Sequence, residues 1–479
     1  MKRICAPLLC LFLLGSGQAL AQFPEDALRL SMPGFGVGAR ALGMGGAYTG
    51  VASDYSAIYW NPAGLAQLTR AEFSAGLSYL NTNDDGTLSG SGGTPFGSTT
   101  GAENNVTNLN SFGIVHPVPV RRGSLVLAFG FQRQASFASG LQFSGYNPNS
   151  SIIQSYAPNG ETAPSELGDN LAYQLYLADV DTLTGRFISP IVNRVTQTGD
   201  VTESGGLNNW SIAGAVDIAP NTSVGLTVTY VSGTYRYDRT YTEEDRNGIY
   251  SVFPYDFAQL DIEDFIEGDI SGVNAKFGLM YRMPDRFRFG LSVKTPTAFT
   301  VKETYGTSAT AHFDNGDRKV YTSDGSVEYD VRTPWVLGVG GSAIIKDLML
   351  SADAEFTDWT TIEFANANSD LLLMNKEMKS LFRSTWEFRI GGEYDVAGSG
   401  FRLRAGYGMR MSPYKGDPSD FDRTTISGGA GMLLGGSVML DLAYANTSWK
   451  NYRSNYDASS RVNEDLSWNT FLATLSYRF

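Results

Sequence analysis

The stretch LVLAFGFQ, residues 125–132, places large apolar side chains on odd positions and small or polar ones on even positions. The same period of two recurs in FRFGLSVK, residues 287–294, and in FRLRAGYG, residues 401–408. Successive side chains of a β-strand point to opposite faces, so this alternation predicts strands with one apolar and one polar face. Both a soluble sandwich and a transmembrane barrel have such strands, because the apolar face meets a core in one and lipid in the other.

The lengths of the connections separate these two architectures. The pattern predicts about fourteen strands, near residues 71–80, 108–118, 123–137, 206–218, 223–240, 269–283, 286–303, 328–344, 347–362, 384–396, 400–413, 423–434, 436–449 and 464–479. Tight turns at 119–122, 219–222, 284–285, 345–346, 397–399 and 435 alternate with long connections at 81–107, 138–205, 241–268, 304–327, 363–383, 414–422 and 450–463. Short turns on one rim and long loops on the other are typical of transmembrane barrels. We therefore expect an all-β fold, an antiparallel transmembrane β-barrel.

The first residues predict export. Lys2 and Arg3 precede an apolar run over residues 4–14, and the small residues at 19–21 offer a cleavage site. We interpret residues 1–21 as a removable signal peptide. Both cysteines, Cys5 and Cys10, lie inside it, so we expect no disulfide in the mature chain.

The chain ends in FLATLSYRF, residues 471–479, with an apolar or aromatic side chain at every odd position up to the terminal phenylalanine. This ending resembles the C-terminal strand by which bacterial outer-membrane barrels are recognised for assembly. It implies the cell outer membrane as location, contact with outer-membrane lipid, and the barrel assembly machinery as a partner during biogenesis. It also fits a barrel whose last strand pairs with its first.

Several function classes are disfavoured. The formal charge of −13 argues against a nucleic-acid partner. Only two histidines, His116 and His312, are present, and neither falls in mid-wall beside a partner, so we expect neither an enzyme nor a metal site. The glycines at 34, 36 and 38 follow no apolar strand, which excludes a phosphate-binding loop. We expect no cofactor.

A lumen of about fourteen strands is open unless something fills it. Residues 22–69 precede the first strand and are the predicted plug, or hatch, with residues 70–479 forming the barrel. Gly34, Gly36 and Gly38 permit close approach of backbones. Pro62 disfavours helical geometry at Asn61, so the chain is expected to turn there.

The segment RALGMGGAYTGVASDYSAIYWNPAGLAQL, Arg40–Leu68, looks like the N-terminal hatch of the FadL/TodX family of hydrophobic-substrate channels. Asn61, Pro62 and Ala63 match that family's NPA motif, after a run rich in glycine and alanine that contains Asp54. The resemblance implies passive uptake of long-chain fatty acids or of aromatic and aliphatic hydrocarbons across the outer membrane. It also implies a hatch that rearranges and a gap in the barrel wall that releases the substrate sideways.

Two groups of hatch residues are therefore candidates. A hinge or gating role is predicted for Asn61, Pro62, Ala63 and Gly64. Contact with an apolar ligand is predicted for Ile58, Tyr59, Trp60 and Leu65. The alternative for the first group is an ordinary turn, since Asn-Pro commonly starts one, and for the second it is simple packing of the plug.

A third group is the set of lumenal cations. Strand parity directs Arg288, Lys294, Arg402 and Arg404 into the lumen, where a cation could hold a carboxylate head group. The same parity directs carboxylates inward, and the alternative is that these charges pair with one another across the lumen.

A second function stays open. The segment from Gly38 to Ala66 also looks like the start of PorV-type barrels, which act as protein partners in secretion and surface attachment. A secretion-system protein is therefore an alternative partner to a hydrophobic small molecule.

Overall fold

The structure, a computed structural model, describes residues 24–157, 167–252, 256–283, 286–457 and 459–479. The predicted signal peptide, residues 1–21, lies outside the described residues.

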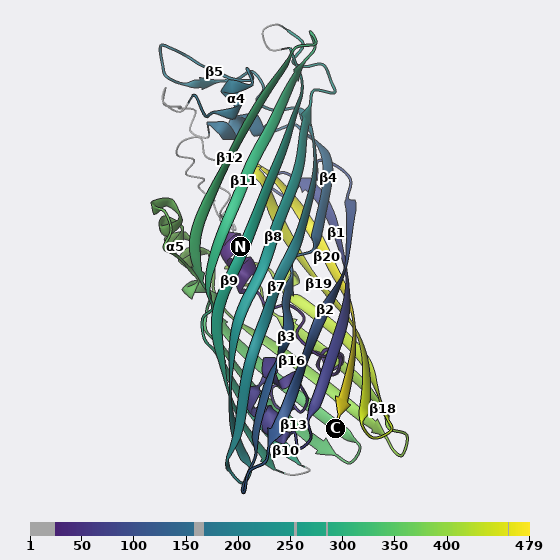
Figure 1. Ribbon diagram of the computed structural model, residues 1–479. Coiled ribbons are helices and arrows are strands. Elements are labelled where there is room, and N and C mark those ends of the chain that lie inside the picture. Colours follow the sequence, from purple (N-terminus) through teal and green to yellow (C-terminus); the bar gives the residue numbers. More distant parts are fainter. Residues whose placement is uncertain (1–23, 158–166, 253–255, 284–285, 458) are drawn as a thin grey trace, which may run out of the picture.

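One antiparallel sheet closes on itself to form a barrel (Figure 1). Its strands are β1 (Glu72–Ser89), β2 (Thr100–Val118), β3 (Leu125–Ser136), β4 (Ser139–Asn147), β7 (Val195–Ala219), β8 (Thr222–Glu244), β9 (Phe257–Met283), β10 (Phe287–Lys294), β11 (Ala298–Phe313), β12 (Arg318–Arg332), β13 (Val336–Ile345), β14 (Leu348–Asp358), β15 (Glu363–Ala365), β16 (Ser384–Val396), β17 (Phe401–Arg410), β18 (Arg423–Leu434), β19 (Val438–Asp457) and β20 (Ser460–Arg478). β20 pairs with β1 over its whole length and closes the wall.

In four places two successive strands lie end to end and pair with the same neighbouring spans, so that together they form one span of the wall. These are β3 with β4, β10 with β11, β12 with β13, and β14 with β15. The barrel therefore has 14 antiparallel spans, and the predicted fold class is confirmed. The spans predicted over 286–303 and 328–344 are interrupted at residues 295–297 and 333–335. Pro296 and Pro334 lie at these interruptions, because proline has no N–H for the ladder.

The parity of the strands is also as predicted. Phe287, Phe289 and Leu291 of β10 are exposed on the outside, whereas Gly290 and Ser292 are buried toward the lumen. An apolar exterior is the arrangement that a bilayer requires of a transmembrane barrel.

The strands are much longer than predicted on the side of the long loops. β9 begins at Phe257 rather than near residue 269, and the connections predicted at 81–107, 241–268, 304–327 and 450–463 are largely strand. In these extensions the outward face carries charged side chains beside apolar ones such as Phe265 and Val320; Glu267, for example, forms an ion pair with Arg236 of β8. A strand that extends past the bilayer needs no apolar face, so the alternation fades while the backbone ladder continues.

The tight turns are confirmed where the structure describes them. Those at 119–122, 219–222, 345–346, 397–399 and 435 join β2 to β3, β7 to β8, β13 to β14, β16 to β17 and β18 to β19. Residues 284–285 lie outside the described residues. In an antiparallel barrel these connections all fall at one rim, the lower one in Figure 1, where the chain also ends.

The hatch lies inside the lower half of this wall (Figure 1). We use the name for residues 24–69, which contain α1 (Pro24–Ser31), α2 (Ala39–Gly43), α3 (Ala57–Trp60) and the 3₁₀ helix η1 (Pro62–Gln67). Ile58 and Leu65 of the hatch are fully buried in an apolar cluster with inward residues of the wall such as Val115, Val126 and Met280.

Six of the remaining elements belong to the connections on the side of the long loops: η2 (Ile152–Tyr156), α4 (Leu171–Gln174), β5 (Asp179–Val180), β6 (Phe187–Ile188), α5 (Ser369–Leu381) and η5 (Ser419–Phe421). The 3₁₀ helix η4 (Trp359–Thr361) instead interrupts the span formed by β14 and β15. The long connection after β4 is folded, since its Ile153 and Leu175 are buried against Tyr241 and Phe257 of the wall. None of the described helices is long and apolar enough to cross a membrane.

Candidate functional site

The Asn-Pro-Ala motif of the hatch rests on three adjacent glycines of the wall. Gly225, Gly278 and Gly290 come from the neighbouring strands β8, β9 and β10. A Cβ atom at Gly225 would lie 2.4 Å from the carbonyl carbon of Pro62, and one at Gly278 would lie 2.2 Å from Asn61 Oδ1. Only glycine leaves room for the motif at this distance from the wall.

Asn61 ties the motif to its surroundings. Its backbone is extended, as expected for a residue before proline, and its Oδ1 accepts a hydrogen bond of 3.2 Å from the N–H of Ala63. Its Nδ2 donates to the carbonyl oxygens of Thr49, at 3.0 Å, and of Leu279 in β9, at 3.3 Å. This buried side chain therefore joins two parts of the hatch to the wall.

Side chains of the wall bind the backbone around the motif. Ser223 donates to the carbonyl of Ala63 and Thr227 to that of Ile58, each at 2.9 Å. Lys276 Nζ donates to the carbonyl of Tyr59 at 2.6 Å. The hatch thus has fixed hydrogen-bond partners on the wall.

The four predicted apolar contact residues are mainly plug packing in this state. Ile58 and Leu65 are fully buried, and Trp60 is nearly so, with its indole N–H donating to the carbonyl of Val37 at 2.9 Å. Tyr59 alone among them is partly exposed.

More glycines of the wall, which the sequence reasoning missed, seat the rest of the hatch. A Cβ at Gly391 of β16 would lie 2.2 Å from the carbonyl oxygen of Met44, and one at Gly406 of β17 would lie 2.1 Å from the N of Gly45. The available signal was a glycine at the inward position of an otherwise well-formed strand, as in FRLRAGYG.

A buried charge cluster fastens the hatch to the opposite side of the wall. Arg40 of the hatch forms two hydrogen bonds of 2.7 Å to the carboxylate of Glu393 in β16. Arg404 of β17 lies 2.7 Å from Glu393 and 2.6 Å from Asp441 of β19. Two guanidinium groups and two carboxylates therefore alternate across the interface between hatch and wall.

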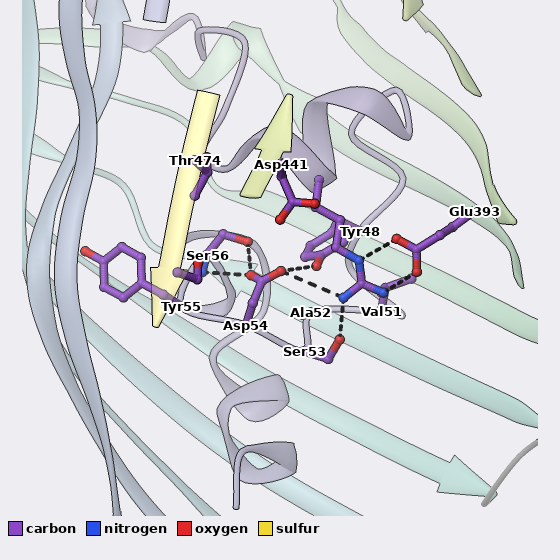
Figure 2. Close-up of polar contacts among 12 residues, drawn as sticks. Tyr48, Val51, Ala52, Ser53, Asp54, Tyr55, Ser56, Glu393, Asp441 and Thr474 are labelled. Atoms are coloured by element: carbon purple, nitrogen blue, oxygen red, sulfur yellow. Dashed lines mark hydrogen bonds and ion pairs between the residues drawn. The ribbon is translucent and has the colours of Figure 1, made fainter. Parts of the chain in front are cut away.

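Asp54 extends this cluster within the hatch. Figure 2 shows Asp54 between Ser56 and Tyr48, with Glu393 and Asp441 approaching from the wall. Ser56 donates to Asp54 Oδ1 from its Oγ at 2.5 Å, and the hydroxyl of Tyr48 donates to Oδ2. The aspartate that follows the glycine-rich run thus holds the fold of the hatch itself.

The four predicted lumenal cations fall into two groups in the structure, those with an ion pair and those without. Arg404 is paired as described, and Arg402 lies 2.6 Å from Asp395 near the short-turn rim. Arg288 and Lys294 form no ion pair within the part of the chain that the structure describes. Pairing with carboxylates of the protein, the alternative raised from the sequence, is therefore found for Arg402 and Arg404.

The wall has a gap between β2 and the span formed by β3 and β4. The β2–β3 ladder ends at the pair Ser111 and Gln132. From there to Thr100, β2 pairs with β1 alone, and β3 and β4 pair with β7 alone. We call the space between residues 103–110 and 133–139, all of which are described, the wall gap.

The hatch fills the wall gap from inside. The N–H of Gly34 donates to the carbonyl of Gln134 on one edge at 3.1 Å. On the other edge Asn110 accepts from the N–H of Gly38, at 3.3 Å, and donates to the carbonyl of Gly36, at 3.1 Å. Residues 34–38 therefore bridge the two unpaired strand edges.

Contacts between the two strand edges define both ends of the wall gap. At the lower end the hydroxyl of Tyr55 donates to the carbonyls of Phe112 and Phe131, at 3.0 and 3.1 Å. At the upper end Asn104 donates to the carbonyl of Ser139 at 3.3 Å. A Cβ at Gly140 would lie 3.5 Å from the Cβ of Ala102, so the two edges approach again there.

Known structures share this architecture. A Pseudomonas aeruginosa FadL homologue is similar with a TM-score of 0.58 and 15% identity over 92% of this chain and 98% of that one. The Pseudomonas putida toluene transporter TodX gives 0.53 and 13% over 93% and 99%, and the Ralstonia pickettii toluene transporter TbuX gives 0.50 and 16% over 93% and 98%. At these identities the similarity shows the fold. No curated protein matches the sequence.

The sequence itself matches a family model over residues 197–479, more than half of the chain. That family is described as outer membrane protein transport protein (OMPP1/FadL/TodX). The matched residues include the wall strands that hold Asn61, Arg40 and the hatch backbone. The chain belongs to the OMPP1/FadL/TodX family of outer-membrane transport proteins.

Proposed function

We propose that this protein is a channel for the passive uptake of hydrophobic small molecules, such as long-chain fatty acids or hydrocarbons, across the outer membrane. The observation that carries the proposal is the wall gap, which the hatch fills from inside through hydrogen bonds at both edges. A bilayer excludes unpaired strand edges from its apolar region unless something covers them. A gap kept closed by a separate segment is the arrangement that lateral release requires. We propose no catalytic role.

The proposed path starts among the long connections and ends at the wall gap. Ligand would enter against the hatch, residues 34–38 would withdraw from Asn110 and Gln134, and the ligand would leave sideways into lipid. The fold is shared with transporters of toluene, which supports a path for apolar molecules.

The motif at residues 61–64 is proposed as the hinge of this movement. Its hydrogen bonds to Thr49 and Leu279 connect the hatch to the wall, so a change there would alter how the whole segment moves. Among the apolar candidates, the partial exposure of Tyr59 supports a contact with ligand.

Arg288 and Lys294 are proposed partners for an anionic head group, since no ion pair engages either of them in the described residues. A ligand at Arg402 or Arg404 would have to displace a carboxylate of the protein. We also propose that the assembly machinery of the outer membrane inserts the barrel.

The direct test is uptake by bacterial cells that lack their own channel of this kind. We expect cells with this protein to take up labelled oleate, dodecane or toluene faster than cells with an empty vector. Replacing both Asn61 and Pro62 with alanine should lower the rate about tenfold, because the hinge loses the three hydrogen bonds of the Asn61 side chain and its fixed turn.

Equal uptake of all three ligands in cells with and without the protein would contradict the channel. Co-purification of a secretion-system protein under the same conditions would then favour the partner role of PorV-type barrels. The amount of folded barrel in the membrane is the control for each variant.

A disulfide between the two strand edges at the upper end of the wall gap tests lateral release. Cysteines at Ala102 and Gly140 place their Cβ atoms about 3.5 Å apart, a distance that a disulfide accepts. We expect oxidation to slow uptake at least about tenfold, because the edges can no longer separate, and reduction to restore it. The two single-cysteine variants, treated alike, are controls. Unchanged uptake by the oxidised pair would show that ligand leaves elsewhere.

A further inference from the structure

The upper mouth of the barrel is filled by the chain itself. In the connection after β4, Ile153 and Leu175 are buried against inward residues of the wall such as Phe257 of β9. Glu243 of β8 also accepts a hydrogen bond of 2.8 Å from the N–H of Ile152 in this connection. A ligand that comes from above therefore meets folded protein, whereas an entry at the side of the barrel avoids it.

The wall has an opening on one side, because its spans differ in height. β12 and β19 extend beyond the spans between them, since β17 ends at Arg410 and β18 begins at Arg423. Within the described residues, residues 318–329 of β12 pair with β11 alone, and residues 449–457 of β19 pair with no strand except β20. We call the opening between these two strand edges the side window.

Helix α5 covers the lower part of the side window. Its Leu371, Met378 and Leu381 are buried in one apolar cluster with Tyr329, at the lower end of the free edge of β12. In Figure 1 the helix lies at the side of the wall, well below the upper ends of β11 and β12. The lumen is therefore separated from the outside at this level by a helix and not by a strand.

The cluster beneath α5 extends across the lumen to the wall gap. It also contains Leu28 of α1, Val231 of β8, Phe299 of β11, and Ala135 and Phe137 on one edge of the wall gap. We call this set the inner apolar cluster. Because its side chains are in contact from one member to the next, it joins the side window to the wall gap through apolar surface.

The outer face of α5 is also apolar in part. Leu372 and Leu373 are 46% and 67% exposed. The next strand, β16, follows α5 directly and carries Trp386 and Phe388 on its outward face. Exposed aromatic side chains are typical of the level at which a barrel leaves the hydrocarbon of the bilayer. The helix thus lies beside the upper end of the lipid-facing surface.

Few polar contacts hold α5 in place. Asn375 accepts a hydrogen bond of 2.7 Å from the N–H of Phe364 in β15 and donates one of 2.9 Å to the carbonyl of the same residue. In the part of the chain that the structure describes, no other polar side chain of α5 hydrogen bonds to another element. The C-terminal end is fixed, since Phe382 forms a bridge with Tyr414. Moving α5 away from β15 therefore breaks only two side-chain hydrogen bonds.

We propose that α5 is the entry gate of the channel, through which an apolar ligand passes from the outer surface of the membrane into the lumen. The helix moves outward about its C-terminal end, and the ligand takes the place of Leu371, Met378 and Leu381 against the inner apolar cluster. It then follows the cluster to the wall gap. The entry gate rests on the proposed function and adds the place at which the ligand enters.

The test is chemical modification of single cysteines on the outer surface. Leu373→Cys places a thiol on the outer face of α5, and Leu183→Cys places one on the connection after β4, where the leucine is 94% exposed. Initial uptake of labelled dodecane is measured before and after treatment with sulfonatoethyl methanethiosulfonate. We expect the sulfonate at position 373 to slow uptake at least about fivefold, because an apolar chain then meets a charge that keeps its water instead of a leucine. The sulfonate at position 183 should leave the rate unchanged, and reduction should restore the rate at position 373.

A second variant loosens the gate instead. Asn375→Leu keeps the size of the side chain and removes both hydrogen bonds to Phe364. One net hydrogen bond corresponds to about a fivefold change, so uptake should become about fivefold faster or more. The control is Ser380→Ala on the same helix, whose hydroxyl bonds only to the carbonyl of Glu377 within α5 and whose loss should not change the rate.

Failure of the gate and failure of the channel give different results. Modification that slows uptake at both positions, at neither, or only at position 183 overturns the entry gate and leaves the channel intact. A rate in Asn375→Leu no faster than in Ser380→Ala overturns it as well. Uptake by the unmodified protein that does not exceed the empty-vector rate contradicts the proposed function itself.

Discussion

Valine in place of Gly391 is expected to push the hatch off the wall and leave an ion-conducting pore. A Cβ at this position would lie 2.2 Å from the carbonyl oxygen of Met44 and 2.9 Å from its carbonyl carbon. Strand β16 cannot move outward to make room, because it forms hydrogen-bond ladders with β14 on one side and β17 on the other. Overpacking of this kind costs about 1–3 kcal/mol or more, and moving the hatch relieves it. The measurement is ion current through single barrels in a planar bilayer.

The neighbouring residue provides a matched control. Gly392 lies on the same strand with its missing side chain directed outward, and a Cβ there would meet nothing closer than a side-chain atom of Leu350 at 3.4 Å. Gly392→Val should therefore leave the barrel as non-conducting as the wild type. Equal currents in the two variants, or none in Gly391→Val, would contradict the role of the glycine as a seat for the hatch.

Leucine in place of Arg404 is expected to lower the free energy of unfolding by about 3–5 kcal/mol, because it leaves a buried carboxylate without its cation. The side chain of Arg404 is 0% exposed, and those of its partners Glu393 and Asp441 are 5% and 7% exposed. Denaturant-induced unfolding of the barrel in detergent micelles, followed by tryptophan fluorescence, measures the change.

Two further variants distinguish the effect of losing the buried ion pair from the effect of losing a positive charge. Arg402→Leu, two residues earlier on β17, removes a pair whose members are 28% and 54% exposed and should cost less than about 1 kcal/mol. The double variant Arg404→Leu/Asp441→Leu should regain most of the loss, because Glu393 keeps its two hydrogen bonds to Arg40. A double variant as unstable as Arg404→Leu would assign the loss to packing instead.

The site was only partly accessible from the sequence. The Asn-Pro-Ala motif and the inward direction of Arg404 followed from local residue order and strand parity, which need no tertiary information. The partners of these residues did not follow. Glu393, Asp441 and Gly278 lie hundreds of residues from the hatch, and nothing in their local sequence says which hatch atom each one meets.

The fold shows the same division. The alternation of residues such as Phe287 and Phe289, together with the spacing of the turns, determined a closed antiparallel barrel with an apolar exterior, because lipid demands an apolar outward face from every span. The strand ends beyond the bilayer were not predicted, because a strand face in water can be polar or apolar and shows no regular alternation. The wall gap was decided by tertiary structure alone. Whether Ser111 or Asn108 ends a ladder depends on the path of a neighbouring strand. Residues 34–38 close the opening only because the barrel holds both strand edges within hydrogen-bonding distance of them.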